Sequence, residues 1–356
     1  MIVNVSSLRC DALVLSRMGV SVIELPSLTE AAVTQAADRY LIAMQIFEQS
    51  TYSAYDQTQH ELAISQTLTW LWDNVARPIL DGLGHTNEPT DSWPHICWCP
   101  TGTLTSLPLH AAGHHAEAAG RTVFDRVISS YTSTARALAG VGKSAYPTRD
   151  SGNDARAMVV IALPDTPGQS HLPGVSYEVN LLRRLFPDDT RVDLIGQSAT
   201  RHSVTAALTT ARLAHFSCHA FQDLLNPAET GFLPYDWQTQ GVIGIKDLTR
   251  REQGAGEFAF LAACKTATGS VVNVDEAINI ATAMQYTGWQ HIIATLWSVE
   301  DNTAALIVAN LYPALFRDTA FDPGRAANEL HNFVRQLRDA TPNRPSTWAP
   351  FMHVGN

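Results

Sequence analysis

The chain has little that would direct it to a membrane or to nucleic acid. No stretch approaches the roughly 20 consecutive apolar residues that a membrane span requires. The N-terminus lacks a basic start and an uninterrupted apolar core, which argues against a signal peptide. Only three of its 24 basic residues are lysines, the net charge is −10, and no basic run or aromatic-interleaved basic stripe is present. We therefore expect neither a membrane nor nucleic acid as a direct partner.

Cysteine is also scarce, since the 356 residues include only five of them. An odd number of cysteines without an export signal argues against a disulfide framework and favours a reducing, cytoplasmic compartment. In such a compartment a free thiolate remains available as a nucleophile. The five cysteines are Cys10, Cys97, Cys99, Cys218 and Cys264.

Two regions of different character follow one another along the chain. Residues 143–156 are rich in Gly, Pro, Ser and Asp, so we place a boundary there. It separates an N-terminal companion subdomain, residues 1–150, from a catalytic subdomain, residues 151–356. In the first subdomain, β-like patterns predict strands over 2–5, 12–15, 20–25 and 95–99, and helical patterns predict helices over 29–49 and 57–76, the second of them ended by Pro78.

The second region alternates strands with amphipathic helices. This alternation predicts an α/β fold, with a doubly wound, mostly parallel sheet and helices on both of its faces. The predicted strands cover 157–163, 191–195, 211–216, 258–263 and 291–296, and the predicted helices cover 175–186, 200–209, 275–286, 302–316 and 323–339.

Two of the predicted strands end in reactive side chains, His219 and Cys264. Functional residues of open α/β sheets lie just past the carboxyl ends of strands, so neighbouring strands would place His219 beside Cys264. A nearby imidazole lowers the pKa of a thiol and yields a thiolate that attacks carbonyl carbons. The histidine precedes the cysteine by 45 residues (264 − 219), which fits the order in caspases rather than that in papain.

Both residues also have a structural interpretation, because a single His or Cys at a strand end is usually a packing residue. Spacing alone leaves the two interpretations open. Two neighbours are assigned to packing: strand parity turns Cys218 to the face opposite His219, and His215 lies deeper in the strand.

Other motifs give weaker signals. Cys97 and Cys99 form a Cys-x-Cys pair with no second pair at zinc-ligand spacing, so core packing is favoured. His110 and His114 stand four apart beside His115, but Ala-Ala-Gly between them predicts a turn instead of a ligand-bearing helix. No Walker-type loop, dinucleotide fingerprint or Gly-x-Ser-x-Gly elbow is present. We therefore expect no metal and no cofactor.

An ordered set of short motifs extends over nearly the whole chain. Its segments are 102–112, 128–133, 172–174 with Glu178, 196–200, 215–219, 261–269, 288–301 and 348–355. With these motifs the sequence resembles a CHAT domain, a caspase-like cysteine peptidase module that is related to separase and often follows tetratricopeptide repeats.

This resemblance implies a role for each site residue. His219 would be the general base and Cys264 the nucleophile, while the backbone N–H groups of Ala220 and Cys264 would hold the oxyanion. The family usually has Gly where this chain has Ala220, and a positive φ there would cost roughly 1 kcal/mol or more. Asp301 stands where separase-like sequences carry an Asp that contacts a basic P1 side chain. The alternative for Asp301 is that it caps the helix beginning at Asn302.

The function that follows is cysteine endopeptidase activity on protein or peptide substrates, with cleavage after Arg or Lys. The resemblance further implies control by a repeat-containing sensor domain or a regulatory protein. One alternative is a catalytically silent scaffold that binds peptides or proteins through the same cleft. Another is acyl transfer from the same dyad to an amine in place of water.

Overall fold

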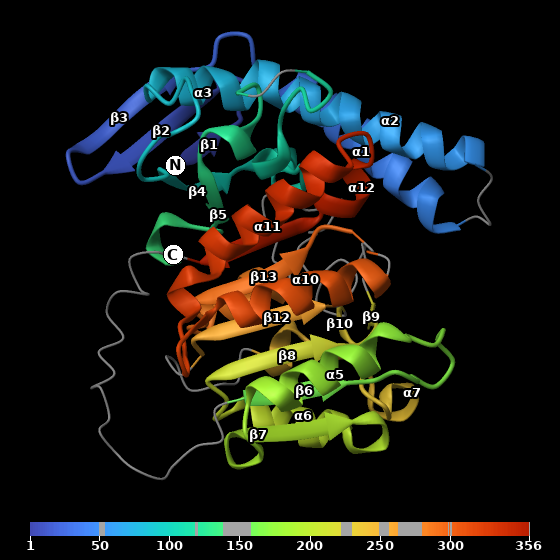
Figure 1. The fold of residues 1–356 in the computed structure, drawn as a ribbon. Helices are drawn as coiled ribbons and strands as arrows, with labels where there is room; N and C mark the ends of the chain where they lie inside the picture. The colour runs from blue at the N-terminus through green and yellow to red at the C-terminus, as the bar shows by residue number, and fades with distance from the viewer. Residues whose placement is uncertain are drawn as a thin grey trace.

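Within the part of the chain that the structure describes, one sheet of eleven strands has the order β3-β2-β1-β4-β5-β16-β13-β12-β8-β6-β7 (Figure 1). The computed structural model describes residues 1–49, 54–117, 120–137, 158–221, 230–248, 256–262, 280–297, 299 and 301–355. The strands are β1 Ile2–Asn4, β2 Asp11–Ser16, β3 Gly19–Glu24, β4 His95–Pro100, β5 Ile128–Tyr131, β6 Met158–Ala162, β7 Arg191–Ile195, β8 Leu213–Ser217, β12 Phe258–Ala262, β13 His291–Thr295 and β16 Phe351–Gly355.

The strands β7, β6, β8, β12 and β13 pair in parallel, which confirms the predicted α/β fold with a mostly parallel sheet. The three strands β6, β8 and β12 consist almost entirely of buried residues, as expected for a sheet covered on both faces. Short strands lie outside this sheet: β9 Ala220–Phe221, β10 Gly231–Phe232 and β11 Ile243–Gly244 in one group, and β14 Phe316–Arg317 with β15 Ala320–Phe321 in another.

Helices cover both faces because the chain reverses its direction across the sheet. It moves outward from β6 to β7 through α5, and returns past β6 to β8 through α6, so right-handed crossovers place α5 and α6 on opposite faces. In Figure 1, α5, α10 and α11 lie in front of the sheet. The helices are α1 Glu30–Gln49, α2 Ala54–Leu71, α3 Arg77–Gly82, α5 Gly174–Leu185, α6 Arg201–Leu208, α7 Trp237–Gln240, α8 Ile245–Leu248, α9 Ile280–Tyr286, α10 Asp301–Ala314, α11 Ala326–Ala340 and α12 Pro345–Trp348.

None of the helices in the described part of the chain has the length and apolar character needed to cross a bilayer. The helix predicted over 275–286 is described only from Ile280 to Tyr286, as α9.

The prediction that Pro78 ends the second helix is wrong. After α2 the chain forms a π-helical turn, Trp72–Ala76, in which the N–H of Arg77 bonds to the carbonyl of Trp72 five residues earlier. Pro78 then stands in the first turn of α3, where a proline is tolerated because the first N–H groups of a helix have no partner within it. The wider turn separates α2 from α3 and allows the helical path to continue to Gly82.

The C-terminal strand β16, which the sequence analysis missed, lies between the two halves of the sheet. It pairs antiparallel with β13 and parallel with β5. Gly355 ends this strand with φ 134°, and a Cβ there would lie 1.9 Å from the carbonyl oxygen of Gln290, so only glycine fits. The predicted boundary at 143–156 falls outside the described residues, and the division at residue 150 stays a prediction.

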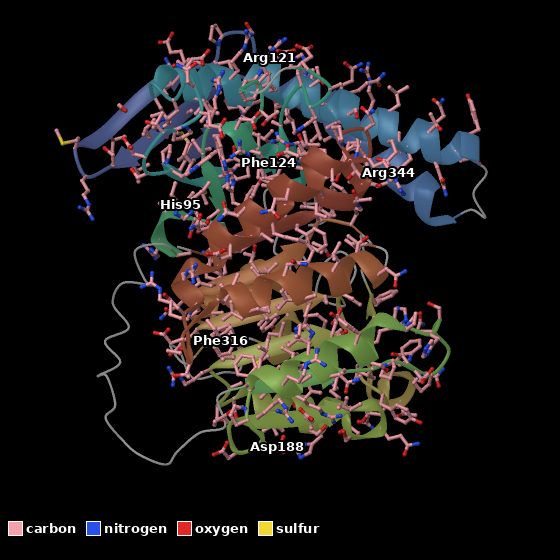
Figure 2. All side chains as sticks on the ribbon, in the orientation of Figure 1. His95, Arg121, Phe124, Asp188, Phe316 and Arg344 are labelled. Atoms are coloured by element: carbon pink, nitrogen blue, oxygen red, sulfur yellow. The ribbon has the colours of Figure 1, made fainter. Side chains whose placement is uncertain are left out.

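A buried ion pair joins α11 to the N-terminal half. Arg338 donates to Asp125 at 2.8 Å and to Thr122 at 3.0 Å, and Thr122 donates to Asp125 at 2.7 Å. Burial raises the pKa of Asp125, but the hydrogen bond and charge of Arg338 outweigh it and bring this pKa below its usual value. Phe124, labelled in Figure 2, packs beside the pair against His331 and Trp348.

We expect Asp125→Ala to lower the free energy of unfolding by about 3–5 kcal/mol, because it breaks a buried ion pair and leaves the buried Arg338 guanidinium with the solvent-exposed carboxylate of Asp339. Asp339→Ala is the matched control. Asp339 also forms an ion pair with Arg338, with 2.7 Å between its Oδ1 and the Nε of Arg338, but its side chain is 60% exposed, so its loss should cost less than about 1 kcal/mol. Urea unfolding of the three proteins measures both effects, and equal costs for the two variants would contradict the prediction.

Candidate active site

The two strands that precede the predicted dyad are neighbours in the sheet. β8 and β12 pair in parallel, with Ser217 opposite Ala262 at their carboxyl ends. His219 follows Ser217 by two residues, and Cys264 follows Ala262 by two residues. Cys264 itself lies outside the described residues. The register therefore brings to the same edge of the sheet the two strand ends from which the dyad was predicted to emerge.

A cavity of about 70 Å³ opens at this edge of the sheet. Its floor includes the last residues of three adjacent strands, which are Ser217 of β8, Ala262 of β12 and Thr295 of β13. The other described residues of its wall come from α5 and the loop before it, from the two residues after β8, from α10 and the segment before it, and from β16. They are Leu172, Glu178, Cys218, His219, Val299, Ala304 and Phe351.

The imidazole of His219 is half-buried at the rim of this cavity and is held by the loop before α5. Its Nε2 lies 2.8 Å from the carbonyl oxygen of Ser170. A carbonyl oxygen only accepts hydrogen bonds, so Nε2 carries the proton and donates it. The neutral ring then has its lone pair on Nδ1, where it can accept a proton from a thiol.

Ala220 occupies the position where glycine was expected, and it does so without strain. Within the described parts of the chain, Asp318 is the one non-glycine residue with positive φ, so the cost considered for Ala220 does not arise. Ala220 pairs with Phe232 in the antiparallel ladder of β9 and β10, and Leu233 donates to the carbonyl of His219. Because hydrogen-bonded and non-bonded pairs alternate, the N–H of Ala220 points away from β10.

Behind the cavity lies a buried polar network that sequence reasoning missed. Glu178 of α5 accepts a hydrogen bond from Nε2 of His215 at 2.9 Å, and Tyr312 of α10 donates to Nδ1 of His215 at 2.9 Å. The side chains of His215 and Glu178 are 0% and 1% exposed. Burial, with the nearby charge of Glu178, raises the pKa of Tyr312 well above its usual value, which keeps the phenol protonated as a donor. His215 is thus a core residue, as expected.

A signal for Glu178 was present in the sequence. Val175, Glu178, Val179 and Leu182 follow one another at helical spacing and form the apolar stripe of α5. A carboxylate in such a stripe is buried by the same packing that buries its neighbours, so it needs a specific partner there.

The CHAT domain family model matches residues 65–356. The chain belongs to the CHAT domain family. A comparison with curated protein sequences gave no match.

Two solved structures are similar to this CHAT chain over 99% of its length, both of them separase–securin complexes from Saccharomyces cerevisiae. One has a TM-score of 0.66 at 10% sequence identity, and the other has 0.66 at 9%. The chain spans only 29% and 30% of the lengths of those separase chains. At this level of identity the likeness concerns the fold, which is the caspase-like α/β fold of the separase domain.

The other cysteines of the CHAT chain are poorly suited to act as nucleophiles. Cys97 donates to the carbonyl of Gly355, and Cys99 to that of Ser133. Burial raises the pKa of the Cys97 thiol to about 12 and also raises that of Cys99. Cys10 and Cys218 are 3% and 2% exposed.

The parity argument for Cys218 is wrong in detail. The strand β8 ends at Ser217, so alternation no longer governs the next residues, and Cys218 and His219 both line the cavity.

The histidines at 110, 114 and 115 have separate partners. His110 contacts Tyr131 and the carbonyl of Ala349, His114 contacts Asp73 and Glu117, and His115 contacts the carbonyl of Ala111. In the portion of the chain that the structure describes, no group of three or more His, Cys, Asp or Glu side chains is arranged to hold a metal ion.

Asp301 begins α10, one residue earlier than the predicted start at Asn302. The placement of its side chain lies outside what the structure describes. Its main chain follows β13 closely, at the same edge of the sheet as the cavity, which Val299 and Ala304 also line.

Proposed function

We propose that this CHAT domain is a cysteine endopeptidase in which Cys264 is the nucleophile and His219 the general base. The observation that carries the proposal is the position of His219. It follows the carboxyl end of β8, its Nε2 is bound to the carbonyl of Ser170, and the neighbouring strand β12 ends two residues before Cys264. A base with a defined tautomer thus stands at the sheet edge where the strand that precedes Cys264 also ends.

The first half of the reaction forms an acyl-enzyme. Nδ1 of His219 takes the proton of the Cys264 thiol, and the thiolate attacks the carbonyl carbon of the scissile peptide bond, forming a C–S bond. The resulting oxyanion accepts hydrogen bonds from the backbone N–H groups of Ala220 and Cys264. When the C–N bond breaks, the protonated imidazole gives its proton to the leaving amine nitrogen.

The second half restores the enzyme. His219 accepts a proton from a water molecule, whose oxygen attacks the thioester carbonyl. The C–S bond then breaks, the carboxylic acid product leaves, and the proton on His219 returns to the sulfur of Cys264. The hydrogen bond from Nε2 to Ser170 holds the ring in one orientation through both halves, so Nδ1 exchanges every proton.

Cleavage is proposed to follow Arg or Lys, because Asp301 occupies the position of the acidic residue that separase-like sequences use for a basic P1 side chain. A protein partner is proposed as the regulator. The two similar separases were solved in complex with securin, and on that analogy we expect this domain to respond to a bound protein. A reducing, cytoplasmic environment would keep the Cys264 thiol available.

The test is hydrolysis of a peptide library that varies only at P1, by the wild-type protein, by Asp301→Asn and by protein alkylated with iodoacetamide. We expect cleavage after Arg and Lys, a loss of roughly 10-fold or more for these two residues in Asp301→Asn, and no cleavage after alkylation. Cleavage that survives alkylation would disprove the thiol mechanism. Peptide binding without cleavage, together with an unreactive Cys264, would establish the scaffold alternative.

A further inference from the structure

One buried carboxylate in the cavity wall is only half satisfied. Oε2 of Glu178 accepts the hydrogen bond from His215, whereas Oε1 has less than 1 Å² of exposed surface and no hydrogen-bond partner among the described residues. Leaving a carboxylate oxygen buried without a donor costs free energy. Glu178 is also the one acidic side chain among the described residues that line the cavity, and no Lys or Arg is among them. The described residues of the wall therefore include a hydrogen-bond acceptor, Oε1 of Glu178, to which none of them donates.

The rest of the cavity favours a particular kind of donor. Leu172, Ala262, Val299, Ala304 and Phe351 give it mainly apolar walls. A mainly apolar cavity with one carboxylate in its wall suits a side chain with an aliphatic stem and a cationic head. His219 lies on the rim of the same cavity. A substrate side chain that fills the cavity is therefore that of a residue next to the scissile bond.

We infer that Glu178 is a specificity-determining residue of this CHAT domain, and that its free Oε1 selects lysine over arginine at P1. The inference rests on the proposed function and narrows its substrate class. An arginine guanidinium is bound best by two carboxylate oxygens at once. At Glu178, His215 already occupies one of the two oxygens, so this residue offers the substrate a single oxygen. A lysine ammonium is a compact point charge that needs only one such contact.

The binding test uses protein that cannot turn over its ligand. Cys264→Ala protein is titrated calorimetrically with peptides that differ only at P1, which is Lys, Arg or norleucine. We expect the Lys peptide to bind about 10- to 100-fold more tightly than the norleucine peptide, and more tightly than the Arg peptide. The added change Glu178→Gln should remove the preference for Lys over norleucine. Asp189→Asn, which removes an exposed carboxylate elsewhere, should retain it.

The kinetic test measures kcat/KM for the same peptides with wild-type protein and Glu178→Gln. The inference is supported if Glu178→Gln lowers kcat/KM for the Lys peptide by about 10- to 100-fold and leaves kcat/KM for the norleucine peptide unchanged. Gln keeps the size of Glu178 and an acceptor for His215, and thermal unfolding of the variant checks that it folds.

The comparison of Lys with norleucine on wild-type protein needs no variant at all. Equal binding of these two peptides, or a stronger response of Arg peptides to Glu178→Gln, overturns the inference even if peptides are cut. If the protein binds Lys peptides preferentially, and this preference depends on Glu178, but no peptide is cut, the inference is supported and the peptidase proposal fails.

Discussion

Replacing Cys264 with alanine is expected to lower kcat/KM for peptide hydrolysis by about 10⁶-fold, because no other group can form the acyl-enzyme. The described cysteines do not replace it, since each is buried or has a raised thiol pKa. His219→Ala should cost nearly as much, because a thiol without its base is mostly protonated at neutral pH. The double variant should lose no more than either single variant, since the two residues act as one unit.

Cys10→Ala is the matched control for the cysteine change. Cys10 is a buried thiol that contacts the carbonyl of Ser6, in the N-terminal part of the chain, so its loss should leave kcat/KM unchanged. Single-turnover assays with purified proteins measure all four variants against wild type. Full activity in Cys264→Ala, or additive losses in the double variant, would contradict the dyad.

The stability of the protein is expected to fall steeply as the pH drops from about 6.5 to 4. Burial lowers the pKa of five histidines to about 4, below the ordinary value of 6.5. The unfolded chain therefore binds protons in this window that the folded chain does not, so stability is complete above pH 6.5 and decreases on acidification. These histidines are His60, His110, His115, His291 and His331.

Each histidine contributes up to about 1.4 kcal/mol per pH unit, so two of them already lower the free energy of unfolding by about 5 kcal/mol between pH 6.5 and 4.5. Urea unfolding at several pH values gives the slope. His331→Gln, at a 5% exposed position on α11, should reduce it by about 1.4 kcal/mol per pH unit. His202→Gln, at an exposed position on α6, should not change it. A slope near zero in the wild-type protein would contradict the prediction.

Much of the fold follows from local patterns. The apolar runs at 158–162 and 258–262 are strands because β-branched and aromatic residues fill a doubly covered sheet, and Thr200 starts α6 by accepting a hydrogen bond from the N–H of Ser203. Such patterns could not predict β16. Pro350 and Gly355 bound this segment, but its five residues alone do not specify a strand, and β5 and β13, which hold it as one, lie far away in the sequence.

Pro78 is a second case in which a local sequence pattern did not suffice to predict the structure. A proline within a helical pattern predicts an end, but a π-helical turn just before it shifts the hydrogen bonds and lets the helix resume. The turn is packed into the core, since Trp72, its first residue, is fully buried.

The alternation of strands and helices, the family and the two residues of the proposed dyad could all be predicted from the sequence, because strand ends and short motifs consist of consecutive residues. Three features could not be predicted in this way: the register that aligns Ser217 with Ala262, the tautomer that Ser170 imposes on His219, and the half-satisfied carboxylate of Glu178. Each of these depends on atoms that are distant in sequence and are brought within hydrogen-bonding reach by packing. The role of a buried carboxylate depends on which of its oxygens has a hydrogen-bond donor and which does not, and only the folded arrangement determines this.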